Sequence, residues 1–329
     1  MSGATAVPRP PRRRPAPVPL YAAAPREGVP PAHSRPARRV RPAPVLARAN
    51  GYILASYGVF VSAGFALGTA LWFVVLGYRL HQPAPAPELA AGIAAAAWTG
   101  SRLMFAAELA WARRLSQATV CTGGHSLYGG IAGGLLLVGV LFADDPSRML
   151  VLADAGASAI ALGYAFGKLG CLVNGCCTGK PTRSRVALRY THDSSRAVLQ
   201  HGLRGVPLTP LQLVESLLGF GLAIGLTLFP ESQFGTGRVL GTFLLALGIT
   251  RFPLLRLRHR AVDEHASRHA SAALSVALAA LGLPLAAGVG VAHAPGPGSA
   301  AAEPLAALGA AALAACAALL LFGLRKEPS

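Results

Sequence analysis

The chain has 329 residues, of which 53% are apolar and only 13% are charged, and its formal net charge is +17. This composition is too apolar for a soluble domain and is typical of a protein that crosses a membrane several times. The basic residues fall in loops beside apolar runs and form no basic face with interleaved aromatic side chains, so we expect no nucleic-acid partner.

The apolar runs predict an all-α integral membrane protein. A hydrocarbon core about 30 Å thick requires roughly 20 apolar residues per helix. We expect a bundle of seven to eight transmembrane helices with one longer polar loop at about residues 171–207. The eight candidate segments are residues 51–77, 88–110, 119–142, 149–170, 208–230, 236–255, 270–292 and 304–324.

Residues 1–50 form a distinct N-terminal region with ten arginines, one glutamate and many prolines. Such a segment buries too little apolar surface to fold, so we expect a disordered tail. The run of three arginines at 12–14 is followed by no apolar stretch, which argues against a secretory signal. The predicted domains are therefore the tail, 1–50, and a transmembrane domain, 51–325.

The first three apolar segments contain several polar side chains. Tyr57 lies at shallow depth, where a phenol serves either as an interfacial anchor or as a ligand contact. Arg102 lies well inside the second segment, where a charge costs about 2.5 to 3.5 kcal/mol. It therefore needs an acidic partner, for which Asp154 and Glu215 are available.

The third segment combines glycines with a histidine and a tyrosine. His125 and Tyr128 are three residues apart, which on a helix gives them a common face where they could hold or move a proton. The neighbouring glycines, Gly129 and Gly130 among them, also fit simple close packing of helices.

Charged residues recur in the later segments. Asp154 and Lys168 are 14 residues apart, which on one helix separates them by about 21 Å along a common stripe. Each therefore needs a polar partner from another helix. Gln212, Glu215 and Arg251 are polar residues in other apolar segments and could be such partners. Two interpretations remain: a ring of polar groups around a cavity, or mutually paired charges that hold the bundle together.

Three of the five cysteines lie close together at the end of the fourth segment. Cys176 and Cys177 are adjacent, and Cys171 precedes them by five residues. This spacing matches neither a Cys-x-x-Cys redox site nor a recognised zinc site, so no metal and no cofactor are predicted.

Five short blocks follow one another along the apolar segments. They are Tyr57-Gly58, Tyr128-Gly129-Gly130, Asp154 with Gly167-Lys168-Leu169-Gly170-Cys171-Leu172-Val173-Asn174-Gly175-Cys176, Pro210-Leu211-Gln212-Leu213-Val214-Glu215 and Leu247-Gly248-Ile249-Thr250-Arg251-Phe252. In this order they resemble the prolipoprotein diacylglyceryl transferase family over roughly residues 51–290.

The chain departs from the family pattern at six positions, which marks it as a divergent, cysteine-bearing branch. The replacements are Lys168 for arginine, Cys171 for asparagine, Cys176 for glutamate, Tyr128 for histidine, and Val214 and Leu247 for tyrosines. Lysine still neutralises a phosphate as a point charge, although it lacks the fork of arginine.

The resemblance implies an enzyme of the bacterial plasma membrane that transfers a diacylglyceryl group from phosphatidylglycerol to the lipobox cysteine of a prolipoprotein. Its partners would be this phospholipid and the prolipoprotein signal peptide. Lys168 and Arg251 would neutralise the phosphate leaving group, and His125, oriented by Tyr128, would activate the acceptor thiol.

The resemblance also implies a set of substrate-binding residues. Asn174 and the Gly175 amide would bind the headgroup, while Asp154 and Glu215 would orient the two cations. The complete predicted set is Tyr57, Gly129, Gly130, Asp154, Gly170, Asn174, Gly175, Gln212 and Glu215.

Two other functions are compatible with the residues. One is a catalytically diverged membrane protein that uses Cys171, Cys176 and Cys177 for thiol redox or soft-metal handling. The other is a small-solute transporter, although no inverted internal repeat is visible. The orientation is also open, because the basic residues place the 171–207 loop in the cytoplasm, whereas the resemblance implies the outer face.

Overall fold

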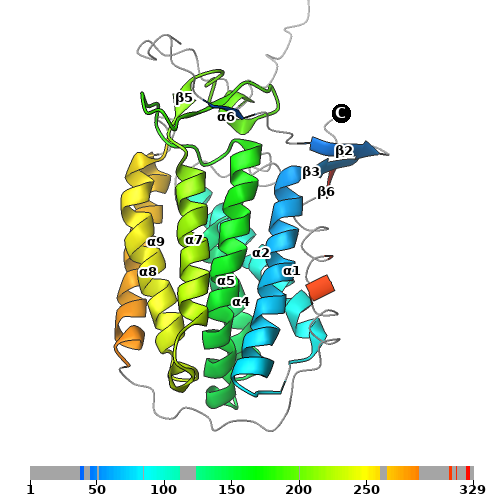
Figure 1. The fold of residues 1–329 in the computed structure, drawn as a ribbon, viewed down its shortest axis with the longest axis vertical. Helices are drawn as coiled ribbons and strands as arrows, with labels where there is room; N and C mark the ends of the chain where they lie inside the picture. The colour runs from blue at the N-terminus through cyan, green and yellow to red at the C-terminus, as the bar shows by residue number, and fades with distance from the viewer. Residues whose placement is uncertain are drawn as a thin grey trace, which may run out of the picture.

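The computed structural model describes residues 38–40, 45–49, 52–83, 85–111, 124–199, 201–259, 265–288, 311–312, 316 and 324–326. Long helices lie side by side in a bundle, and short strands gather at one end of it, here called the loop end (Figure 1). The long helices are α1 (Ser56–Val74), α2 (Pro87–Trp111), α4 (Leu127–Leu141), α5 (Pro146–Asn174), α7 (Leu211–Thr227), α8 (Arg238–Leu257) and α9 (His265–Ala286).

The predicted all-α membrane fold is confirmed. Five of the described helices are long and apolar enough to cross a membrane by length and composition, and α4 and α7 are shorter apolar helices. A π-helical turn, Val75–Arg79, extends α1. Most of the eighth candidate segment, 304–324, and most of the 1–50 tail lie outside the described residues, so the exact number of helices and the domain division stay predictions.

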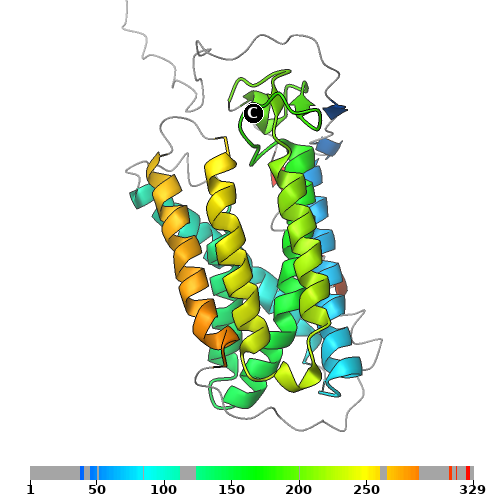
Figure 2. The same cartoon turned by 60° about the vertical axis from the view of Figure 1, so that its left-hand side comes forward.

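The helices pack in three groups. α8 packs against α9, α2 packs against α4, and α5 lies between α1 and α7. In Figure 2 the pair formed by α8 and α9 is tilted relative to α1, α5 and α7. The α2–α4 contact depends on Gly100, Gly129 and Gly133, because a β-carbon at any of them would collide with backbone atoms of the facing helix. Gly129 therefore serves helix packing.

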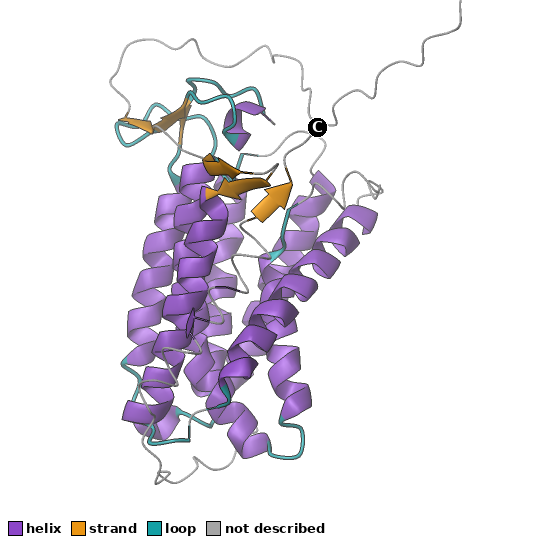
Figure 3. Ribbon diagram, turned by 90° about the vertical axis from the view of Figure 1, so that its right-hand side faces the viewer, coloured by secondary structure: helices purple, strands orange, loops and turns teal. Residues whose placement is uncertain are grey.

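Two small sheets cover the loop end (Figure 3). In the first, β4 (Leu188–Tyr190) pairs in parallel with β1 (Arg38–Val40) and antiparallel with β5 (Pro207–Leu208). In the second, β3 (Tyr52–Ala55) pairs antiparallel with β2 (Val45–Ala49) and with β6 (Leu324–Lys326). A short helix, α6 (Arg196–Leu199), follows β4.

The opposite end of the bundle contains several large buried aromatic side chains. Trp72, Phe73, Phe234 and Phe243 belong to one buried cluster there. Beside them Asp154 is fully buried, and its two carboxylate oxygens accept hydrogen bonds from the backbone N–H groups of Gly237 and Leu240, each at 2.8 Å. The prediction that Asp154 orients the cations is wrong, because the first turn of α8 occupies both of its oxygens.

The third segment starts later than the sequence predicts. α4 begins at Leu127, and Ser126 before it has extended backbone. His125 therefore precedes the helix, and the prediction that it shares a helical face with Tyr128 is wrong. The glycine before it, Gly124, belongs to the same non-helical approach to α4.

Candidate active site

A cavity of about 590 Å³ lies among α1, α2, α4 and α5 and reaches α8 and α9 at the loop end. Toward the opposite end its wall is apolar, with Phe65, Trp72, Leu135 and Ile160 among the lining side chains. The predicted site residues on its wall are Tyr57, His125, Tyr128, Gly130, Lys168, Asn174 and Arg251. The structure therefore brings seven of the thirteen together around one space.

The other six predicted residues do not line this cavity. Gln212 and Glu215 lie directly behind the wall and hydrogen-bond residues that line it. Gln212 donates to the Cys176 carbonyl oxygen, and Glu215 accepts from Lys168 and Arg251. Gly170 packs against Tyr57, and a β-carbon there would lie 3.2 Å from the Tyr57 ring and backbone. Gly175 ends α5 with a φ of 71°, in the left-handed region that favours glycine.

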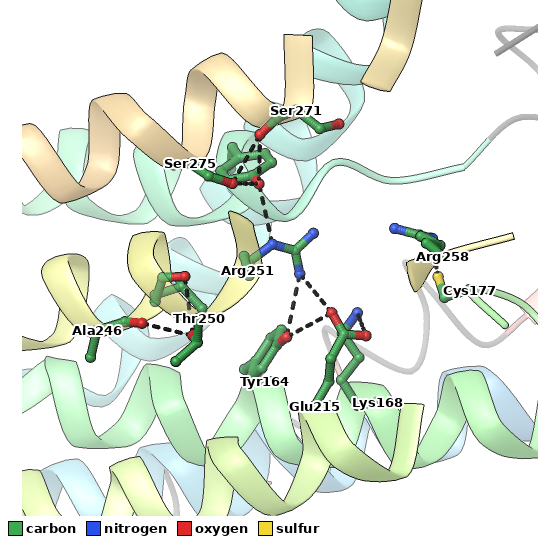
Figure 4. A network of polar contacts seen from close by, with 12 residues as sticks. Tyr164, Lys168, Cys177, Glu215, Ala246, Thr250, Arg251, Arg258, Ser271 and Ser275 are labelled. Carbon is green, nitrogen blue, oxygen red and sulfur yellow. Dashed lines mark hydrogen bonds and ion pairs between the residues drawn. The ribbon is translucent and has the colours of Figure 1, made fainter. Parts of the chain in front are cut away.

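Glu215 is the centre of the polar network (Figure 4). One of its oxygens accepts a hydrogen bond from Lys168 Nζ at 2.7 Å. The other accepts from Arg251 Nη1 at 3.3 Å and from the Tyr164 hydroxyl at 3.2 Å. All three charged side chains are at least nine-tenths buried. Glu215 thus positions both predicted cations, as the resemblance implies.

Two tyrosines hold the guanidinium of Arg251 from other sides. Its Nε donates to the Tyr128 hydroxyl at 3.2 Å, and its Nη1 donates to the Tyr164 hydroxyl at 3.3 Å. The Tyr128 hydroxyl donates in turn to the Ser271 carbonyl oxygen on α9 at 3.0 Å. Tyr128 therefore supports Arg251, and the predicted orientation of His125 by Tyr128 is replaced by this contact.

The charges of this network do not cancel. Lys168 and Arg251 carry two positive charges, and Glu215 carries one negative charge, so the formal sum is +1. Burying charges is costly even when they are paired, and ionisable residues inside a membrane mark functional sites. A buried site with excess positive charge beside an apolar cavity suits an anionic group attached to apolar chains.

His125 also lies on the cavity wall. Its Nδ1 shares a hydrogen bond of 3.1 Å with the Ser101 hydroxyl of α2. Nearby, Arg102 donates to the Gly124 carbonyl oxygen at 3.1 Å. The predicted pairing of Arg102 with Asp154 or Glu215 is not found among the contacts of the described residues, since each acid is bound as given above.

A second basic group lines the loop end of the cavity, and the sequence did not single it out. Arg258 follows the last residue of α8 and hydrogen-bonds the Cys177 sulfur. The rings of His201 and His259 lie edge to face with centroids 5.3 Å apart. Both histidines and Arg258 line the cavity together with Arg196. The only signal for Arg258 was its place in a basic loop.

Electrostatic surroundings shift two groups in this loop region. Hydrogen bonds from the Cys171 and Cys176 thiols, together with the Arg258 charge, hold the pKa of the Cys177 thiol well below its ordinary value. Burial, and then the positive charge of Arg258, lowers the pKa of His201. The Arg258 charge therefore stabilises negative charge on the Cys177 sulfur, and burial opposes positive charge on His201.

Comparison with known proteins gives a consistent result. A family model described as prolipoprotein diacylglyceryl transferase matches residues 44–287. Phosphatidylglycerol–prolipoprotein diacylglyceryl transferase 2 of Clostridium perfringens (strain 13 / Type A) is 31% identical over 136 residues, which cover 41% of this chain and 51% of that protein. The transferase of Acaryochloris marina (strain MBIC 11017) is 30% identical over 200 residues, or 59% and 73% of the two chains.

A third relative, the transferase of Polynucleobacter asymbioticus (strain DSM 18221 / CIP 109841 / QLW-P1DMWA-1), is 33% identical over 143 residues, which cover 43% of this chain and 51% of that protein. The chain thus spans about half the length of several of the curated relatives it matches. Because the family model covers most of the transmembrane helices described above, this membrane protein belongs to the prolipoprotein diacylglyceryl transferase family.

Proposed function

We propose that this protein transfers the diacylglyceryl group of phosphatidylglycerol to the cysteine thiol of a prolipoprotein in the bacterial plasma membrane. The main support for the proposal is a single cavity that is apolar at one end and positively charged at the other. Its wall is apolar among α1, α2, α4 and α5, and it meets the buried cations Lys168 and Arg251 at the loop end. An anionic phospholipid has the same two-part character.

The phosphate is the leaving group of the reaction. Negative charge develops on its oxygen as the bond to the diacylglyceryl carbon breaks, so catalysis requires positive charge already in place. Lys168 and Arg251 provide that charge, and Glu215 acts as a positioning residue because it fixes both of them. Tyr128 and Tyr164 orient the guanidinium plane of Arg251 toward the cavity.

The acceptor thiol must lose its proton before it attacks. His125 lies on the cavity wall and is our candidate base, with Ser101 holding its ring. Asn174 ends α5 at the loop end of the same wall and is placed to bind the headgroup. Tyr57 and Gly130 complete the surface that meets the substrate, and the prolipoprotein signal peptide would approach along the bundle.

The test is a transfer assay with the full chain in proteoliposomes, using radiolabelled phosphatidylglycerol and a lipobox peptide. Lys168→Ala and Arg251→Ala are each expected to lower the rate by about 100-fold or more, as the removal of one stabilising donor does in other enzymes. The matched control is Arg256→Ala, because Arg256 lies on α8 within two turns of Arg251 but is exposed.

Lys168→Arg tests whether the positive charge at this position is what the reaction needs. The family pattern has arginine at this position, so this variant is expected to retain most of the transfer rate. Wild-type rates in both alanine variants would overturn the proposal. A wild-type protein that is monodisperse in detergent but transfers no lipid to the peptide would overturn it as well.

For the orientation, we propose that the loop end faces the outer side of the plasma membrane. A reporter inserted after Ser184, an exposed residue of the loop, tests this directly. Alkaline phosphatase activity at that position is the expected result. Fluorescence of a cytoplasmic reporter without phosphatase activity would instead support the orientation that the basic residues favour.

A further inference from the structure

The three cysteines at the loop end converge on one point. The Sγ atoms of Cys171, Cys176 and Cys177 all lie within 4.8 Å of one another. Their spacing along the chain matches no recognised metal motif, although the sequence left a joint soft-metal role for the three cysteines open. Gly175, with a φ of 71°, and Cys177, with a φ of 58°, both have left-handed backbone and turn the chain back over the last turn of α5.

Hydrogen bonds on both sides hold the segment in this shape. The backbone N–H of Cys176 donates to the Cys171 carbonyl oxygen at 3.2 Å. Gln212, almost fully buried on α7, donates from Nε2 to the Cys176 carbonyl oxygen at 2.7 Å. The carbonyl oxygen of Thr178 accepts from the backbone N–H of His259 at 2.8 Å. The arrangement is therefore preformed by neighbours from three elements.

Three sulfur atoms at this separation suit a tetrahedral zinc ion. With Zn–S bonds of about 2.3 Å, the sulfur ligands of such an ion lie about 3.8 Å apart. Structural zinc sites have four protein ligands, whereas catalytic sites have three and leave one position for water or substrate. Three cysteines that line a cavity correspond to the second class.

The charges around the cluster also suit a zinc ion. A zinc ion with three thiolates carries a formal charge of −1. Arg258, which hydrogen-bonds the Cys177 sulfur, supplies the compensating positive charge.

We propose that Cys171, Cys176 and Cys177 bind one Zn²⁺ ion whose fourth position takes the acceptor thiol of the transfer reaction. The proposal rests on the proposed function and names how the nucleophile is activated. It also gives a role to Cys171 and Cys176, which replace asparagine and glutamate in the family pattern, and it differs from the expectation that the protein has no metal.

The step is a substitution without redox change. The acceptor thiol binds the zinc ion as a thiolate, since coordination deprotonates a thiol, and its proton passes through cavity water to His125. The thiolate sulfur then forms a bond to the diacylglyceryl carbon. The bond from that carbon to the phosphate oxygen breaks, and its electron pair leaves on glycerol phosphate, facing Lys168 and Arg251. The neutral thioether product is a weak ligand and dissociates.

The first experiment measures metal content. The full chain is purified in detergent under reducing conditions and loaded with Zn²⁺, and the zinc bound per chain is determined by mass spectrometry after desalting. We expect about one zinc per wild-type chain and less than about a tenth in Cys176→Ser and Cys177→Ser. Cys316→Ser is the matched control, because Cys316 is exposed and remote in sequence from the cluster. It should retain the wild-type content.

Size-exclusion profiles separate loss of zinc from loss of folding. A monodisperse Cys176→Ser chain without zinc supports the site, and a monodisperse wild-type chain without zinc overturns it. Replacement by Co²⁺ gives a second readout that does not depend on activity. An intense sulfur-to-cobalt absorption band in the wild type, which weakens in each single serine variant, is expected, and its absence from the wild type overturns the site.

A second experiment separates this proposal from the proposed function. Removal of zinc with a chelator should lower transfer by the wild type about 100-fold, and added Zn²⁺ should restore it. Full transfer by the zinc-free chain overturns the activation step while the transferase proposal stands. A chain that binds zinc through the three cysteines but transfers no lipid keeps the metal site and overturns the transferase proposal together with the activation step.

Discussion

Asp154 and Glu215 are both buried carboxylates, but they lie at opposite ends of the bundle and bind different kinds of donor. Asp154 accepts from two backbone N–H groups in the first turn of α8. Glu215 accepts from the side chains of Lys168, Arg251 and Tyr164. The first arrangement joins α5 to the N-terminus of α8 through neutral backbone donors, whereas the second holds two cations beside a cavity. Burial of an acid alone therefore does not distinguish a structural role from a functional one.

The largest combined effect, on both stability and transfer, is expected at Glu215. Glu215→Ala leaves Lys168 and Arg251 buried without their counterion, and breaking a buried pair in this way costs about 3 to 5 kcal/mol. The fraction of monodisperse protein and the melting temperature in detergent measure this loss. The double variant Glu215→Gln with Lys168→Met should recover much of the stability but none of the transfer. If Glu215→Ala were as stable as the wild type, Glu215 would not be the counterion of Lys168 and Arg251.

Asp154→Ala is expected to lower stability by a similar amount but through a different mechanism, and to leave transfer unchanged. Each buried N–H group left without an acceptor costs about 1 to 3 kcal/mol, and α8 also loses a negative charge at its N-terminus. The melting temperature should fall, while the transfer rate per folded molecule stays at the wild-type level. Asp154→Asn keeps one acceptor oxygen, so its melting temperature should lie between those of the wild type and Asp154→Ala. If folded Asp154→Ala lost transfer, Asp154 would have a functional role as well, and the contrast with Glu215 would be wrong.

The smallest of these effects is expected at Tyr128. Tyr128→Phe removes the hydroxyl that links Arg251 to α9, at a cost of about 0.5 to 1.5 kcal/mol. We expect a transfer rate lowered by about tenfold, because Arg251 keeps its contacts to Tyr164 and Glu215 but loses one of its supports. Thermal melting and the proteoliposome assay measure the two effects. Unchanged transfer would remove Tyr128 from the group that positions Arg251.

The positions of the helices followed from sequence because each coincides with an apolar run. Their ends followed less well. The third segment contains Gly124, His125 and Ser126 before its helix, and an apolar count includes them although α4 begins at Leu127. That difference moved His125 off the helix and removed its predicted alignment with Tyr128.

The partners of the buried charges could be predicted only in part. The motif that contains Glu215 pointed to Lys168 and Arg251, because all three belong to the family pattern. Tyr164 was missed, although it precedes Lys168 by one helical turn. The partner of Asp154 was not predictable, since backbone N–H groups carry no sequence signal. The sequence grouped the three cysteines as an alternative thiol or metal site, but it could not show that their sulfur atoms meet, because two left-handed residues create a proximity that spacing rules do not describe.

The short length of α4 has a consequence for how the proposed lipid donor would reach the site. Fifteen helical residues span about 22 Å, less than a hydrocarbon core of about 30 Å. A bilayer adapts to such hydrophobic mismatch by thinning locally. Lys168 lies six residues, or about 9 Å, before the end of α5. A membrane that thins beside α4 would bring the plane of the lipid phosphates closer to the depth of Lys168. The headgroup would then travel a shorter distance into the protein, because the bilayer is locally thinner.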